Sequence, residues 1–192
     1  IRKPKVAIFG DLYVRDNDVM NQDLIRSIEE AGGEALATPY NDYAKLTIEN
    51  IFRRAIQRGE VVSTGMNRII LNLLKFMDER YYKAFAGILG PAPVIKPKEL
   101  EKRLAEFNID LLHSGESYDN LLKIFYIVEN YPDVALFVQT NPSFCCPALV
   151  TEAMTQKIKE YTGVPIVTIT YDGTSDQMND VIVPYIQSRV LQ

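Results

Sequence analysis

The chain alternates short apolar runs with longer amphipathic stretches. The apolar runs stop at turn residues such as Gly10 and Pro39, which is typical of strands buried on both faces of a parallel sheet. This pattern predicts four strands, at residues 6–9, 34–38, 133–138 and 166–170.

Apolar residues spaced three and four apart predict helices between these strands. They cover residues 21–31 and 148–161, and a last helix begins at Thr174 or Ser175. Strands that alternate with helices form parallel sheets with helices on both faces. We therefore predict an α/β fold whose doubly wound, four-stranded parallel sheet has the strand order 2-1-3-4.

Residues 41–131 lie between the second and third strands and contain no convincing strand. A crossover between parallel strands needs about a dozen residues, so most of this segment exceeds what the connection requires. Its amphipathic pattern predicts a helical insertion subdomain. We find no linker or repeat and interpret residues 1–192 as a single α/β domain; since the chain begins with Ile1, we expect a piece of a longer protein.

Three loops follow the carboxyl ends of strands in this topology, at residues 10–17, 140–147 and 171–175. Ligands of open α/β sheets bind at that edge, where the strand order reverses. Simple turn formation also explains Gly-Asp and Asp-Gly pairs in such loops, so both interpretations stay open. Under the ligand-binding interpretation, the predicted contacts are Gly10, Asp11, Asn141, Asp172 and Gly173.

Both cysteines, Cys145 and Cys146, stand between the third strand and the following helix. A helix N-terminus stabilises a thiolate, which is the form that binds metal. Neighbouring side chains point apart, so we expect Cys145 to face the crevice and the other cysteine to pack inward. Two thiolates do not complete an iron–sulfur cluster, which usually takes four. The alternative is that both are small apolar residues of the core.

The composition narrows the function classes. The 192 residues are 47% hydrophobic and 24% charged, and the formal net charge is −4. This charge gives no general attraction to nucleic acid or to an anionic membrane, and no apolar run approaches the roughly 18 residues of a membrane-spanning helix. Two adjacent cysteines argue against a disulfide scaffold, so we expect a cytoplasmic protein.

Two further features each allow a structural interpretation and a functional one. Arg53, Arg54 and Arg58 form one basic helix face, which is either solvated or a grip for phosphate groups. His113 is the only histidine and is most simply a polar residue near a helix end. No Ser-His-Asp triad can be assembled around it.

Several segments together resemble the 2-hydroxyacyl-CoA dehydratase superfamily. They are KVAIFGDLYVR at residues 5–15, Gly115-Glu116, VQTNPSFCCP at residues 138–147 and TYDGT at residues 170–174, in that order. The pattern is similar to the dehydratase-like part of large CoA-substrate-specific enzyme activases. It extends from about residue 5 to about residue 185.

The resemblance implies a flavodoxin-like α/β domain and iron–sulfur chemistry. In that superfamily, cysteines from more than one domain hold the clusters, and a separate ATP-hydrolysing activator passes an electron to them. Cys145 occupies the cysteine of the superfamily's Asn-Pro-x-x-Cys motif. The implied partners are other domains of the parent protein, an acyl-CoA, and an activator or dehydratase.

These observations lead to two hypotheses. The first is a dehydratase-like activase domain that helps enclose an iron–sulfur cluster or an acyl-CoA site, with Cys145 and Cys146 as the candidate metal ligands. The remaining thiolates are absent from this sequence, so the chain alone is not expected to be a complete catalyst. The alternative is a non-catalytic α/β assembly or ligand-binding module whose cysteines are structural.

Overall fold

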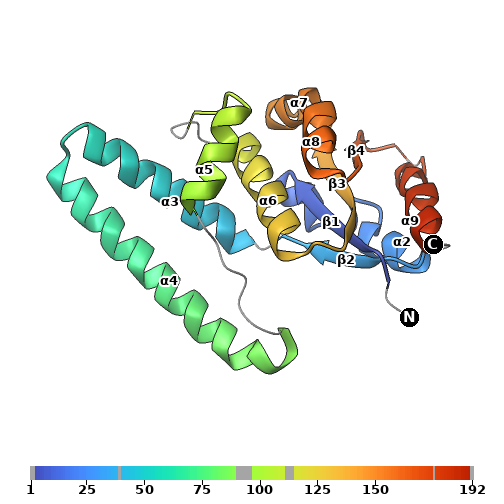
Figure 1. The fold of residues 1–192 in the computed structure, drawn as a ribbon, viewed down its shortest axis with the longest axis horizontal. Coiled ribbons are helices and arrows are strands. Elements are labelled where there is room, and N and C mark those ends of the chain that lie inside the picture. Colours follow the sequence, from blue (N-terminus) through green and yellow to red (C-terminus); the bar gives the residue numbers. More distant parts are fainter. Residues whose placement is uncertain (1–2, 39, 90–96, 111–114, 175, 191–192) are drawn as a thin grey trace. The chain divides into compact units, whose positions relative to one another are not determined.

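A computed structural model describes residues 3–38, 40–89, 97–110, 115–174 and 176–190 (Figure 1). Contacts divide the chain into two compact units. The α/β unit comprises Ile1–Thr38 and Glu116–Gln192, and the helical unit comprises Pro39–Gly115.

The α/β unit is built on one parallel sheet. Its strands are β1 (Lys5–Gly10), β2 (Glu34–Ala37), β3 (Val134–Pro142) and β4 (Ile166–Tyr171). Among the described residues they form a four-stranded sheet in the order β2-β1-β3-β4, with every pair parallel. The predicted α/β class, the strand order and the flavodoxin-like arrangement with a helical insertion are confirmed.

Helices cover both faces of the sheet because its central strands are apolar on both. One face packs against α2 (Leu24–Glu30), the 3-10 helix η1 (Met178–Ile182) and α9 (Val183–Val190). On the other lies α6 (Glu116–Asn130), which contacts β1, β3 and α7 (Cys146–Ala153). Each fully buried Leu, Ile or Phe of these layers contributes roughly 1.5–3 kcal/mol.

Alternation along β1 shows how one strand serves two cores. Val6 and Ile8 belong to the cluster beneath α2 and η1. Phe9 packs edge-to-face on Phe137 of β3, with ring centroids 6.0 Å apart. Since successive strand residues point to opposite faces, the side chains of β1 pack into the core on both sides of the sheet.

Several predicted boundaries differ from the structure. The helix predicted at 21–31 spans Leu24–Glu30. The third strand continues to Pro142, past the predicted end at residue 138, because β4 pairs with β3 along this polar stretch. The helix predicted at 148–161 is two helices, α7 and α8 (Thr155–Thr162), because the Met154 N–H donates to Thr151 in a tight turn. The last predicted helix begins as the 3-10 helix η1 and becomes α-helical only at Val183.

The helical unit contains α3 (Tyr40–Gln57), α4 (Val61–Leu89) and α5 (Pro97–Glu106). A tight turn joins α3 to α4 at Gly59, whose φ of 69° is left-handed, and glycine adopts this conformation without a steric penalty. Lys45 of α3 and Asp78 of α4 form an ion pair across the hairpin. The insertion predicted at 41–131 is thus a compact unit at 39–115, while α6 belongs with the sheet.

Within the described residues, no helix combines the length and the apolar character that crossing a membrane requires.

Candidate functional site

The loop after β1 is joined directly to β3. The Asp11 N–H donates to the Thr140 carbonyl at 2.8 Å. Gly10 has a φ of 119°, and a Cβ atom there would lie 2.2 Å from the same carbonyl oxygen. A side chain at residue 10 therefore cannot be accommodated unless the two backbones separate.

Asp11 is held as the N-cap of a short helix, α1 (Leu12–Arg15), where the sequence predicted only a loop. Its Oδ1 accepts the N–H groups of Tyr13 at 3.0 Å and Val14 at 2.9 Å. Aspartate is a favoured N-cap because its oxygen satisfies these otherwise unpaired donors. The carboxylate is consequently fixed at the carboxyl end of β1.

Glu116 is the first residue of α6, and its carboxylate accepts the Leu12 N–H. The contact brings the start of α6 to the loop after β1. The guanidinium of Arg15 also lies close enough to Glu116 to lower the pKa of its carboxyl. Arg15 is itself buried, and its Nη1 donates to the Thr38 hydroxyl at 2.7 Å.

Cys145 is the N-cap residue of α7. Its N–H donates to the Pro142 carbonyl at 3.3 Å, and its sulfur accepts the Ala148 N–H. The first turn of α7 is attached to β3, because the Gln139 side-chain amide donates to the Ala148 carbonyl at 3.0 Å. Strand β3 thus fixes the helix turn that carries the thiol.

Phe144 precedes this thiol in an unusual conformation. Its φ is 65°, and the residue is 95% exposed. Left-handed backbone is costly for a residue with a Cβ atom, and such strain is concentrated at functional sites and tight turns. The bend it produces ends the β3 segment and starts α7.

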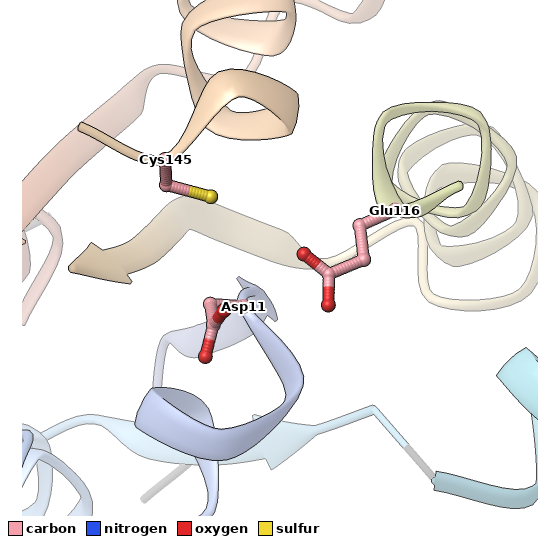
Figure 2. A group of neighbouring side chains, drawn as sticks. All are labelled: Asp11, Glu116 and Cys145. Atoms are coloured by element: carbon pink, nitrogen blue, oxygen red, sulfur yellow. The ribbon is translucent and has the colours of Figure 1, made fainter. Parts of the chain in front are cut away.

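The loop after β1, the start of α6 and the turn before α7 bring Asp11, Glu116 and Cys145 together (Figure 2). Their ligand atoms all lie within 4.8 Å of one another, and each residue is partly exposed. Figure 2 shows the Cys145 sulfur and the Glu116 carboxylate directed into the same space from α7 and α6. We refer to the three residues as the edge cluster.

The surroundings of the edge cluster disfavour negative charge on Glu116 and Cys145. Burial and the neighbouring Asp11 raise the pKa of the Glu116 carboxyl, opposed by the Leu12 N–H and Arg15. Burial, then Glu116 and Asp11, also raise the pKa of the Cys145 thiol, although the Ala148 N–H acts against them. The helix N-terminus was expected to favour a thiolate at Cys145, whereas burial and the two carboxylates favour the protonated thiol.

The other predicted metal ligand, Cys146, lies outside the edge cluster. It is exposed, so the expectation that the second cysteine packs inward is wrong. Cys146 already belongs to the first turn of α7, whereas the N-cap residue before it faces the sheet edge.

The remaining predicted contacts serve local structure. Asn141 is buried and donates to the Thr170 hydroxyl at 2.9 Å, which joins the ends of β3 and β4. Asp172 is exposed and accepts the Thr174 N–H at 2.9 Å, a bond that lowers the pKa of its carboxyl. Gly173 has the φ of 84° that this turn requires. Ser175 and His113 lie outside the described residues.

Sequence reasoning named Asp11 and Cys145 but gave Glu116 no role at the site. The only sequence feature that pointed to Glu116 was the Gly115-Glu116 pair at the start of a helix. A carboxylate at that position ordinarily stabilises the first turn of its own helix. In the structure the carboxylate instead accepts from the neighbouring helix α1.

The edge cluster offers two carboxylate oxygens and one sulfur. Carboxylate and thiolate together suit a borderline divalent cation such as Zn²⁺ or Fe²⁺. An iron–sulfur cluster usually takes four thiolates, and among the described residues this group supplies one. Comparison with protein-family models, with curated proteins and with solved structures finds no match to this chain.

Proposed function

We propose that this chain is a dehydratase-like domain of a cytoplasmic CoA-substrate-specific enzyme activase, related to 2-hydroxyacyl-CoA dehydratases. Its role is to help enclose an iron–sulfur cluster or an acyl-CoA at the carboxyl edge of the sheet. The observation that carries this proposal is the position of Cys145, which is partly exposed near the edge where the loop after β1 meets the end of β3. The order of the resembling segments supports it.

This chain would supply only part of the ligand set of an iron–sulfur cluster. Cys145 would serve as one thiolate ligand, and the missing thiolates would come from other domains of the parent protein. Bound iron would supply one-electron chemistry. The chain's own residues would position that thiol, since the Ala148 N–H and the Gln139-anchored turn fix the sulfur.

A cation at this position would also reverse the electrostatics of the edge cluster. The carboxylates of Asp11 and Glu116 disfavour a thiolate only while their charge is uncompensated. A bound metal ion stabilises the deprotonated thiol directly, so metal uptake here is coupled to proton release. The proposal therefore predicts tighter metal uptake at higher pH.

The test is anaerobic reconstitution of the protein that contains this chain with iron and sulfide. Visible absorption and electron paramagnetic resonance are compared for the wild type, Cys145→Ser and Cys146→Ser. We expect Cys145→Ser to lose or alter the cluster signal, whereas the neighbouring Cys146→Ser serves as the matched control. An unchanged spectrum in Cys145→Ser would remove this residue, and the proposal with it.

A non-catalytic assembly or ligand-binding module is the second candidate, and one observation favours it. The Asp11 and Glu116 carboxylates both accept N–H groups from the start of α1, which gives each a structural role. Under this alternative, Asp11→Asn and Glu116→Gln lower the melting temperature, and neither they nor Cys145→Ser changes the metal content of the purified protein. Loss of bound metal in those variants would contradict it.

A further inference from the structure

The helical unit has a cleft of its own, at the closed end of the α3–α4 hairpin. Its volume is about 350 Å³, which is at the lower end of the range for small-molecule sites. Ala55 of α3 is buried and also lines this cleft. All of the lining residues belong to the helical unit, so the cleft is complete within it.

Four polar side chains line the cleft. Arg54 belongs to α3, and Arg58 lies just beyond its end. Ser63 and Asn67 belong to α4, and residues four apart lie on one face of a helix. The cleft therefore brings two guanidinium groups together with a hydroxyl and an amide.

The structure separates the three arginines that the sequence grouped together. Arg53 forms an ion pair with Glu49 at 3.0 Å, one turn back on its own helix. It does not line the cleft. Arg54 and Arg58 do, so the phosphate-binding interpretation of this basic face narrows to two residues.

We propose that this cleft binds the phosphate group of a small organic phosphate. This inference is independent of the function proposed for the sheet edge. Guanidinium groups bind phosphate oxygens through paired, charge-assisted N–H donors. The Ser63 hydroxyl and the Asn67 amide also line the cleft and add donors, so several oxygens of one phosphate can be satisfied together.

The rest of the lining suits an organic substituent. Ile51 and Met66 also line the cleft, and the two residues are 48% and 63% exposed. Apolar surface of this kind gains from contact with the carbon skeleton of a ligand. The ligand class is therefore a phosphate ester with an apolar group, in preference to free inorganic phosphate.

One acidic residue limits the affinity of the cleft. Glu60 lines it and lies 3.9 Å from the Arg58 guanidinium, and both side chains are substantially exposed. Its charge repels an anion and competes for Arg58. Removal of this charge should therefore strengthen phosphate binding, an effect that loss of folding cannot imitate.

The experiment uses the 192-residue chain and titrates it with phenyl phosphate and with inorganic phosphate at low ionic strength, measured by isothermal calorimetry. We expect phenyl phosphate to bind more tightly than inorganic phosphate. Arg54→Gln and Arg58→Gln should each weaken binding about tenfold or more, the size expected for a lost charge-assisted contact. Glu60→Gln should strengthen it several-fold.

Arg68→Gln is the matched control, because Arg68 is exposed on α4 but does not line the cleft. Arg54→Lys keeps the charge but loses the paired donors, so its affinity should fall between those of wild type and Arg54→Gln. Circular dichroism checks folding. The proposal is overturned if phenyl phosphate does not bind, if inorganic phosphate binds as tightly, or if Arg68→Gln weakens binding as much as Arg58→Gln does.

Discussion

The edge cluster and the hairpin cleft are chemical opposites built by different means. The edge cluster collects acceptors and a thiol from three segments that are far apart in the sequence, and backbone hydrogen bonds fix Asp11 and Cys145. The cleft collects donors from two consecutive helices and the turn between them, and spacing along the helix places Ser63 and Asn67 on one face of α4. A site formed by segments that are distant in the sequence is rigid but hard to predict from the sequence. A site formed by the periodicity of helices is easier to predict but is held less firmly.

The largest expected effect comes from a comparison of one glycine from each region. Gly10→Ala places a methyl group against the Thr140 carbonyl in left-handed backbone, so we expect a loss of at least about 3 kcal/mol in unfolding free energy. Gly59→Ala in the hairpin turn meets nothing within 4 Å and should cost only about 1 kcal/mol of backbone strain. Urea denaturation measures both, and equal losses would contradict the rigid junction at Gly10.

The two thiols should differ next in reactivity. Each is isolated by changing the other cysteine to serine, and its alkylation by iodoacetamide is followed near neutral pH. Cys146 is exposed, whereas burial and the two carboxylates raise the pKa of Cys145. Since the thiolate is the reactive form, we expect Cys146 to react about tenfold faster or more.

Glu116→Gln sharpens this second comparison. In the Cys146→Ser background it removes one of the charges that raise the pKa of Cys145, so alkylation of Cys145 should accelerate. A rate for Cys145 that equals that of Cys146, and that does not respond to Glu116→Gln, would show that the edge cluster exerts no electrostatic control.

A smaller effect is expected in the pH dependence of stability. The folded-state pKa of Glu116 is raised above its usual 4.5, so the folded protein holds this proton more tightly than the unfolded chain does. Stability is therefore lost as the pH rises from 4.5 through the raised pKa. Glu116→Gln lacks this titration and should therefore gain a small amount of stability relative to wild type over that window, an effect that solvent screening reduces. A stability difference that stays constant with pH would contradict it.

The smallest effect is predicted in the cleft. Arg58 is largely exposed and lies 3.9 Å from Glu60, and such surface pairs contribute little. Arg58→Gln should therefore change the unfolding free energy by less than about 0.5 kcal/mol while it weakens phosphate binding. A large loss of stability would place Arg58 in the framework of the hairpin and remove the contrast between the two regions.

The sheet was predictable because its strands are apolar on both faces, and their order followed from the alternation of strands and helices. The end of β3 was not, since Gln139, Thr140 and Asn141 are polar yet buried, and only their partners on neighbouring elements explain this. Helix α1 carried a readable signal in Asp11, whose type is a favoured N-cap. The tight turn at Met154 carried none.

The candidate site was predictable in part for the same reason. Strand topology placed Asp11 and Cys145 at one edge, but the approach of Glu116 depends on how α6 packs over β1 and β3. Likewise, the direction of the pKa shift of Cys145 is set by burial and by carboxylates remote in sequence. Local rules for a helix N-terminus do not include such neighbours.

The close contact between Gly10 and Thr140 leaves the loops after β1 and β3 no slack. The separation of the oxygen and sulfur atoms above them inherits the stiffness of the two central strands. A ligand at this edge would therefore meet donor atoms whose spacing is set before the ligand arrives.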